Sequence, residues 1–452
     1  MIDIQSLKIR RKKLANLIDI PAVLWSGKSP SRNFRANHYP FRASSHFLYF
    51  AGITLENAAI KLDNGNLDLF LDNSHSDSSL WYGEMPTRED IAQQIGADNA
   101  YPMNALKEQI NEVATIPVQD IFTYGKQREI LQRSLSINKD LKKIDEQLMK
   151  AIISLRLTHD KTALEEIKKA VDVSVKAHKI GIKSTKKSTT EAQVRAAIES
   201  YIISKNMTCA YNSIVTINGE ILHNETYDNQ LKPGDLLLAD VGAETSLGWA
   251  SDITRTWPVS GKFSSSQRDI YDIVLAAHDV CIEGMKPGVE YRDIHLLGAK
   301  VIAEGLVDLG ILKGHPESLV EKDTHAIFFP HGIGHLLGLD VHDMEDLGDL
   351  AGYQEGRTRS DRFGLGYLRL DRPLKVGMLV TIEPGFYQVP AILNNPKFQE
   401  KYYNDVNWDK LKQFSDVRGI RIEDDVLVTE TGAEILTKNL PNKAIDIEEM
   451  MK

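Results

Sequence analysis

The sequence predicts a mixed α/β protein with two domains, residues 1–157 and residues 158–452. Two observations favour this fold class. The chain has 452 residues, more than one hydrophobic core usually serves. Short apolar runs bounded by turn residues, which are typical of strands, occur together with longer stretches of helical periodicity. The domain boundary is placed near Thr158, where a charged helical stretch ends and the pattern changes.

The N-terminal domain contains the clearest predicted β-hairpin. Residues 58–62 and 67–71 flank Asn64-Gly65, a dipeptide preferred at both central positions of a type I′ turn. The other elements predicted here are strands at residues 22–25 and 47–50 and a helix at residues 137–155. Together these elements predict a compact mixed α/β unit.

Three helices are predicted in the C-terminal domain. Thr162 with Glu165, and Ser188 with Glu191, have the spacing of a capping box at a helix start. The second helix carries one apolar stripe at helical spacing, made of Val194, Ala197, Ile198, Tyr201 and Ile202. The third helix is predicted from about Gln267 to Met285. We interpret all three as structural helices.

An internal repeat predicts two related halves in this domain. Residues 232–242 (K-P-G-D-L-L-L-A-D-V-G) align without gaps on residues 375–385 (K-V-G-M-L-V-T-I-E-P-G). The Lys, one Gly, a Leu, an acid and the last Gly are in register. The aligned acids are Asp240 and Glu383, each at the end of an apolar strand. We infer a duplication whose two halves enclose one site.

Each of these acids is followed by a second one. Asp252 lies 12 residues after the first acid, and Glu423 lies 40 residues after its partner, which predicts an insertion of about 28 residues around residues 390–415. Gly242 and Gly248 predict a hairpin in the first half. Because strand side chains alternate between faces, the first two carboxylates can point to the same side of this hairpin. Either aspartate alone would more simply be explained as a turn cap.

A histidine cluster adds a different kind of ligand. His331, His335 and His342 fall within twelve residues of a chain that has 13 histidines, and the first two belong to the glycine-rich turn H-G-I-G-H. Glycines allow the backbone to approach a site closely, and imidazoles bind metals or transfer protons. One or two of these histidines could instead be hydrogen-bonded residues of the core.

The clustered residues have the chemistry of a two-metal hydrolase. Carboxylates shared between two divalent ions offset their adjacent positive charges, and oxygen-rich ligand sets favour metals such as Mn²⁺. Such ions can activate water for hydrolysis. The candidate metal ligands are Asp240, Asp252, His335, Glu383 and Glu423.

Bulk properties exclude several classes of partner. The chain has 54 Lys and Arg against 63 Asp and Glu, a net charge of −9 that disfavours binding to nucleic acid or an anionic membrane. Cys209 and Cys281 are too few for a disulfide framework. The start M-I-D-I-Q-S-L-K-I-R-R has no apolar signal region, and no run reaches the roughly 18 apolar residues of a membrane span. We expect a cytoplasmic enzyme with a small substrate.

Residues 160–440 resemble a Xaa-Pro peptidase of the methionine-aminopeptidase clan, whose catalytic domain has the pita-bread fold. The resemblance rests on G-D-L-L-L-A-D-V-G-A-E, W-A-S-D-I-T-R-T-W-P, H-G-I-G-H-L-L-G-L-D-V-H-D, I-E-P-G-F-Y and G-I-R-I-E-D-D-V-L-V-T. It implies duplicated ααβββ-type halves. The N-terminal part, with F-R-A-S-S-H-F-L-Y-F-A-G-I, more weakly resembles the creatinase-like domain of aminopeptidase P.

The resemblance also implies a role for each candidate residue. Asp252 and Glu423 would bridge two metal ions, Asp240 would complete one ion, and His335 and Glu383 would complete the other. A hydroxide bridging the ions would attack the Xaa-Pro carbonyl, with Glu383 in proton transfer. The remaining implied positions are His223 and His342, which would hold the substrate and stabilise the tetrahedral intermediate, and His331, Tyr387 and Arg421 around the pocket.

Two activities within this family remain open. Aminopeptidase P removes the first residue from longer Xaa-Pro peptides, whereas prolidase cleaves Xaa-Pro dipeptides and must hold their carboxylate, for which arginine is the natural partner. Arg369, in L-G-Y-L-R-L-D-R-P, matches the prolidase arginine, or is a surface arginine near Asp371. The segments G-K-F-S-S-S-Q-R-D-I-Y-D-I-V-L and L-W-Y-G are closer to bacterial aminopeptidase P, which we favour.

Other implications concern cofactors and partners. The resemblance implies two divalent ions, with Mn²⁺ preferred over Co, Zn or Fe, and a homo-oligomer, either a dimer or a tetramer. The substrate would be a peptide with proline in second position. A catalytically inactive binding scaffold is a remote alternative, because such relatives have replaced their ligands. Organophosphate hydrolysis remains open as a side activity.

Overall fold

The computed structural model describes residues 3–74, 77–137 and 141–452. The chain forms two compact units. One contains the residues up to Leu157 together with Ser246–Gly248 and Asp346–Ala351. The other contains Thr158–Thr245, Trp249–Glu345 and Gly352–Lys452. None of the helices in the described ranges has the length and apolar content needed to cross a membrane.

The N-terminal unit is built on a five-stranded mixed sheet with the order β4-β3-β2-β1-β5. The central strands pair antiparallel, and the β3–β4 and β1–β5 pairs are parallel. The strands are β1 (Ala22–Trp25), β2 (Ala59–Asp63), β3 (Asn66–Phe70), β4 (Asn99–Tyr101) and β5 (Ala114–Thr115). The helices are α1 (Ile4–Ala15), α2 (Ser45–Ala51), α3 (Ser78–Tyr82), α4 (Arg88–Ile95), α5 (Leu106–Gln109), α6 (Ile121–Leu131) and α7 (Lys143–Arg156).

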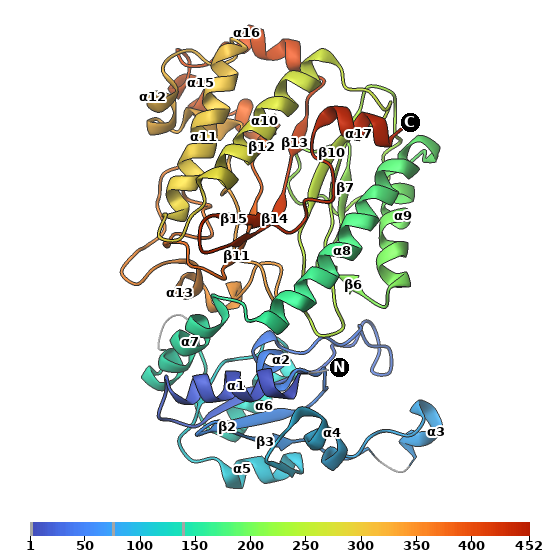
Figure 1. Ribbon diagram of the computed structural model, residues 1–452, viewed down its shortest axis with the longest axis vertical. Helices are drawn as coiled ribbons and strands as arrows, with labels where there is room; N and C mark the ends of the chain where they lie inside the picture. Colours follow the sequence, from blue (N-terminus) through green and yellow to red (C-terminus); the bar gives the residue numbers. More distant parts are fainter. Residues whose placement is uncertain (1–2, 75–76, 138–140) are drawn as a thin grey trace. The chain divides into compact units, whose positions relative to one another are not determined.

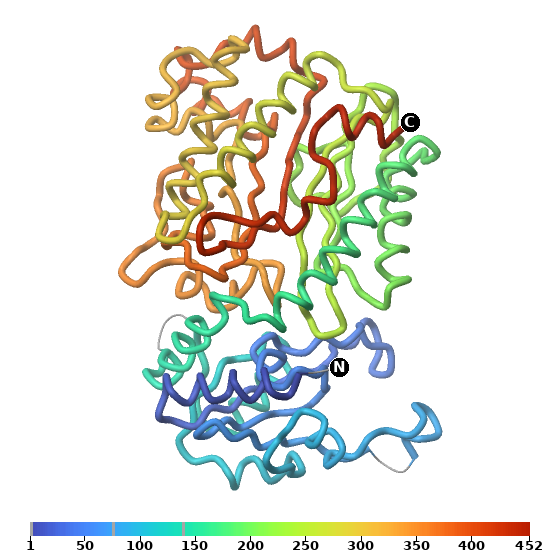
Figure 2. The backbone as a smooth tube through the Cα atoms, viewed as in Figure 1, coloured from blue at the N-terminus to red at the C-terminus, as the bar shows by residue number. Residues whose placement is uncertain are grey.

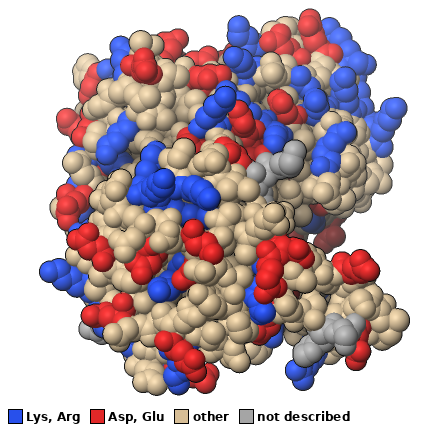
Figure 3. All heavy atoms as spheres, turned by 60° about the horizontal axis from the view of Figure 1, so that its bottom comes forward, with Lys and Arg blue, Asp and Glu red and all other residues tan. Residues whose placement is uncertain are grey.

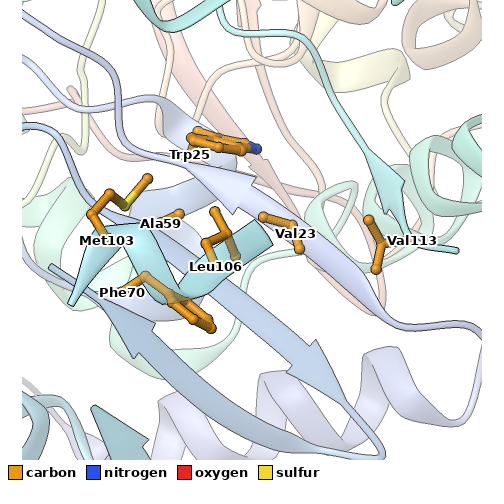
Figure 4. Close-up of a cluster of buried hydrophobic side chains, with 7 residues drawn as sticks. All are labelled: Val23, Trp25, Ala59, Phe70, Met103, Leu106 and Val113. Atoms are coloured by element: carbon orange, nitrogen blue, oxygen red, sulfur yellow. The ribbon is translucent and has the colours of Figure 1, made fainter. Parts of the chain in front are cut away.

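The core of this unit is a cluster of apolar side chains from β1, β2, β3 and the segments that follow β4 (Figure 4). Burying this apolar surface is the main driving force for its folding. The cluster consists of Val23, Trp25, Ala59, Phe70, Met103, Leu106 and Val113.

The hairpin and first strand of this unit are confirmed. Asn64 and Gly65 have φ of 51° and 82°, as a type I′ turn requires. The strand predicted at residues 47–50 is wrong, because these residues lie in helix α2. Every residue of α2 is buried. A short apolar run that is buried on all sides has the same sequence pattern in a helix as in a strand, so periodicity cannot distinguish the two. The helix predicted at residues 137–155 begins at Lys143, and residues 138–140 lie outside the described part of the chain.

The C-terminal unit repeats one order of elements. In each half, two packed helices precede a three-stranded sheet. The first half contains the helices α8 (Lys161–Ser184) and α9 (Glu191–Ser204) and the strands β7 (Ile214–Thr216), β8 (Leu236–Asp240) and β10 (Thr254–Pro258). The second half contains the helices α10 (Ser265–Gly284) and α11 (Tyr291–Asp308) and the strands β11 (Leu379–Ile382), β14 (Asp424–Val428) and β15 (Ala433–Ile435). Figure 1 shows the two helix pairs, green and yellow, on opposite sides of the strands. This is the duplicated pita-bread arrangement that the repeat and the resemblance predicted.

The remaining elements are short. Two-stranded sheets are formed by β6 (Thr208–Cys209) with β9 (Ala243–Glu244), and by β12 (Gly385–Tyr387) with β13 (Gly419–Arg421). The residues predicted to be an insertion contain α14 (Pro390–Leu393), α15 (Pro396–Lys401) and α16 (Trp408–Leu411). The other short helices are α12 (Pro316–Glu321), α13 (Asp349–Gly352) and α17 (Ala444–Met450).

The predicted helix caps are wrong for the first two helices. The carboxylate of Asp160 caps α8 by accepting the N–H of Ala163 at 2.8 Å. Thr190, not Ser188, caps α9. In both cases a nearby residue with an equivalent oxygen takes the cap position. The third helix begins close to the prediction, with a capping box at its N-cap Ser264.

Candidate functional site

A cavity of about 630 Å³ lies in the C-terminal unit. Nearly all of the predicted site residues line it: His223, Asp240, Asp252, His331, His335, His342, Arg369, Glu383, Arg421 and Glu423. Tyr387 is not among the lining residues, because its side chain is fully buried behind them. Residues that are far apart in the sequence therefore share one cavity.

The two related halves each deliver two carboxylates to this cavity. Asp240 ends β8 and lies opposite Thr254 of the antiparallel strand β10, with Asp252 two residues earlier. Glu383 directly follows β11, and Glu423 directly precedes β14. The halves are joined here by the N–H of Glu423, which donates to the carbonyl of Thr254 at 3.1 Å. Figure 2 shows the red segment that carries β13 and β14 running beside the yellow-green segment of β10.

His335 reaches the carboxylates because Gly334 lets the backbone approach β11. A Cβ at Gly334 would overlap the carbonyl oxygen of Thr381. The Nδ1 atom of His335 lies 3.0 Å from the carbonyl oxygen of Leu336, which can only accept, so Nδ1 carries the proton. The unprotonated Nε2 then faces the carboxylates, and lies 3.4 Å from Oδ2 of Asp252.

The donor set fits a divalent metal site. One ligand atom from each of Asp252, His335 and Glu423 lies within 4.8 Å of the others, and all three residues are buried. Nε2 of His335 is also 3.8 Å from Oε1 of Glu383. Asp240 is joined to the group through the hydroxyl oxygen of Tyr211, which lies within hydrogen-bond distance of both Asp240 and Asp252. Carboxylate oxygens with a single imidazole are ligands for ions such as Mn²⁺ or Zn²⁺.

Without bound cations, the ionised form of these buried carboxylates is unfavourable. Burial raises the pKa of Asp252 well above its usual range, and the neighbouring charge of Asp240 raises it further. Burial and then the charge of Asp252 act on Glu423 in the same direction, raising its pKa. Burial raises the pKa of Glu383 to about 7. A divalent cation would remove both the desolvation and the repulsion penalties.

Arg421 supplies the positive charge nearest to this group. Its guanidinium donates from Nη2 to Oδ2 of Asp240 at 2.6 Å, from Nε to Oγ1 of Thr254 at 3.0 Å, and from Nη1 to the Tyr387 hydroxyl at 3.0 Å. Thr254 in turn donates its hydroxyl proton to Oε2 of Glu423 at 2.7 Å. One buried arginine thus positions carboxylates from both halves.

His331 is held as a neutral ring behind Glu383. Its Nδ1 lies 2.7 Å from the carbonyl of Gly332 and therefore donates, while Nε2 accepts from the Tyr387 hydroxyl at 2.8 Å. Burial, followed by the charge of Arg421, lowers the pKa of His331 to about 3, so the ring stays uncharged. Tyr387 therefore orients two predicted pocket residues, His331 and Arg421, and does not itself face the cavity.

His342 and Arg369 are linked by Glu345 at the cavity wall. Nδ1 of His342 donates to Oε2 of Glu345 at 2.7 Å, and Nη1 of Arg369 donates to Oε1 of the same carboxylate. The ring of His342 lies edge-on to that of His335, with centroids 4.3 Å apart. His223 lines the cavity with an exposed side chain.

Sequence reasoning missed four residues that hold the site together. Tyr211 and Thr254 contact the carboxylates directly, and Asp425 accepts the main-chain N–H of Asp252 at 3.2 Å. Glu345 joins two cavity residues. Thr254 and Asp425 lie within the recognised motifs and could have been suspected. Tyr211 lies 29 residues before Asp240 with no motif of its own, so only the folded chain reveals it.

Comparisons with known proteins confirm the resemblance. Residues 165–430 match the model of metallopeptidase family M24, and residues 7–121 match that of the aminopeptidase P N-terminal domain. A probable Xaa-Pro aminopeptidase of Fusarium vanettenii is 33% identical over 415 residues, which cover 89% of this chain and 85% of that one. The Xaa-Pro dipeptidase of Homo sapiens is 29% identical over 456 residues, covering 95% and 88%. The structure of Pseudomonas aeruginosa aminopeptidase PepP superposes with a TM-score of 0.82 at 28% identity, covering 100% of this chain and 98% of that one. This chain belongs to metallopeptidase family M24, among the Xaa-Pro peptidases that carry an aminopeptidase P N-terminal domain.

Proposed function

We propose that this protein is a Xaa-Pro aminopeptidase, which releases the first residue of a peptide whose second residue is proline. The observation that carries the proposal is the convergence of four carboxylates and one imidazole on one cavity. We assign two Mn²⁺ ions to this site. Asp240, Asp252, His335, Glu383 and Glu423 would hold these ions.

The ions supply Lewis acidity and activate water when they are bound. The chain's own residues then handle protons and orientation. We assign proton transfer to Glu383, whose Oε1 faces His335 at 3.8 Å and whose Oε2 faces the neutral His331 at 3.7 Å. A carboxyl group at this junction can take a proton from the attacking water and give it to the departing proline nitrogen.

His342 and His223 are proposed to hold the substrate, and Arg421 is proposed to position the pocket. Glu345 fixes the ring of His342 through Nδ1, which leaves Nε2 available to the peptide. Burial lowers the pKa of His342, and the hydrogen bond to Glu345 acts in the opposite direction. On taking up a proton, the ring would donate from Nε2 to an oxygen that becomes negative in the transition state. Arg421 keeps Asp240 in place through its 2.6 Å contact.

Prolidase activity is the second candidate function. Arg369 lines the cavity, and a guanidinium can bind the terminal carboxylate of a Xaa-Pro dipeptide. The similarity to the human Xaa-Pro dipeptidase also supports this reading. Against it, the guanidinium of Arg369 already contacts Glu345. We therefore favour the aminopeptidase.

Turnover of two matched substrates distinguishes these functions. We expect the Mn²⁺-loaded protein to cleave the first bond of a Xaa-Pro-Yaa tripeptide at least as well as the Xaa-Pro dipeptide with the same first residue. A Xaa-Ala-Yaa tripeptide is the control and should be cleaved far more slowly, because an ordinary peptide bond lacks the ring that the pocket recognises. Cleavage confined to the dipeptide would make the protein a prolidase.

A further inference from the structure

Glu345 is a cavity-lining carboxylate that contacts two other lining residues. Its Oε1 accepts from Nη1 of Arg369, and its Oε2 accepts from Nδ1 of His342 at 2.7 Å. Because each oxygen has its own donor, the carboxylate is held in one orientation across the cavity wall.

Arg369 is a partly exposed arginine of this cavity whose guanidinium is paired with a carboxylate. Three arginines line the cavity within the described ranges. The side chain of Arg421 is 5% exposed, and its nitrogens already contact Asp240, Tyr387 and Thr254. Arg359 is exposed and donates to the carbonyl of Leu368 at 3.2 Å. Arg369 has a side chain that is 34% exposed, and its partner Glu345 is 47% exposed.

The ion pair with Glu345 weakens the attraction of Arg369 for a substrate carboxylate. A dipeptide places its carboxylate directly after proline, whereas each added residue moves that charge up to about 3.5 Å further along the chain. Near a neutral Arg–Glu pair, a dipeptide carboxylate must either displace Glu345 or lie close to a second negative charge. A longer peptide places a neutral amide at that position and avoids both penalties.

We propose that Glu345 is a specificity-determining residue, which neutralises Arg369 and thereby favours peptides that continue beyond proline over Xaa-Pro dipeptides. This inference rests on the proposed Xaa-Pro peptidase function and names the substrate length that the site selects. The hydrogen bond from His342 lowers the pKa of Glu345 to about 2, so the opposing charge persists throughout the neutral pH range.

Glu345→Gln tests this role, with kcat/KM measured on a Xaa-Pro dipeptide and a Xaa-Pro-Yaa tripeptide. Gln keeps the shape of the side chain and removes its charge. We expect the dipeptide-to-tripeptide ratio to rise roughly fivefold, which is the equilibrium equivalent of a half-exposed ion pair. The loss of support for His342 should lower both rates together, and the ratio is insensitive to such a common loss.

Two further variants make the test specific. In an Arg369→Gln background, Glu345→Gln should raise the ratio much less, because no guanidinium is released. Glu199→Gln breaks a comparable ion pair with Arg195 on the outer face of α9 and should leave the ratio unchanged. An unchanged ratio in Glu345→Gln, or an equal rise in the two backgrounds, would overturn the role of Glu345. Failure of the unmodified protein to cleave either substrate would instead overturn the proposed function.

Discussion

Replacing Asp252 by Asn is expected to lower turnover of Xaa-Pro peptides by on the order of 10³-fold or more and to reduce the metal bound per chain. Four carboxylates match the four positive charges of two divalent ions, and the amide removes one of these negative charges. Oδ2 of Asp252 lies 3.4 Å from Nε2 of His335, closer than Oε1 of Glu383 at 3.8 Å, so its loss weakens the centre of the cluster. Metal content by elemental analysis and kcat/KM on the tripeptide measure the two effects.

The expected loss is not an effect of unfolding. The amide side chain of Asp252→Asn would keep an oxygen for the hydroxyl of Tyr211 and would remove a buried charge whose pKa burial already raises. The metal-free variant should therefore melt no lower than the metal-free parent. Asp272→Asn makes the same chemical change in an exposed ion pair on α10 and should retain full activity. Two bound ions and normal turnover in Asp252→Asn would contradict the proposed site.

The cluster of carboxylates and His335 in one cavity was predictable, because each of these residues lies in a recognisable local sequence pattern. Asp240 and Glu383 end apolar strands, and β8 and β11 are buried at every position, as such runs predict. His335 follows a glycine that must allow close backbone approach. The repeat then indicated that the two halves share one cavity. Composition is less specific, and Figure 3 shows both acidic and basic side chains on the face in view.

The contacts between those patterns were not predictable from sequence. Tyr211 and Asp240 meet because β7 and β8 pair, and the Thr254 hydroxyl reaches Glu423 across 169 residues. The pairing of Arg369 with Glu345 depends on how two loops lie at the cavity wall. Such contacts result from long-range packing, which spacing along the chain does not encode. The wrong strand prediction in the region of α2 has the same cause, because the burial of this helix depends on the elements that pack around it.

The unmodified protein without metal is expected to lose stability as pH rises from 5 to 8. Glu383 titrates near 4.5 when unfolded and at about 7 when folded. The folded state therefore binds more protons between these values, and the free energy of unfolding falls as pH increases through that window. Glu383 alone contributes a loss on the order of 3 kcal/mol above pH 7. Asp252 and Glu423 act in the same direction, because their pKa values are also raised in the folded state.

Bound metal should reverse this trend, because the cations stabilise the ionised carboxylates that burial otherwise disfavours. The rise in melting temperature on adding Mn²⁺ to chelator-treated protein is therefore expected to be larger at pH 8 than at pH 5. Taking the difference between loaded and metal-free protein at each pH removes the contribution of groups outside the site. Glu383→Gln is the matched variant: it lacks one of the carboxyls whose pKa is raised, so its metal-free form should lose less stability between these pH values. An equal or smaller gain at pH 8 would show that the buried carboxylates are not held together by cations, since the metal would then relieve no charge repulsion.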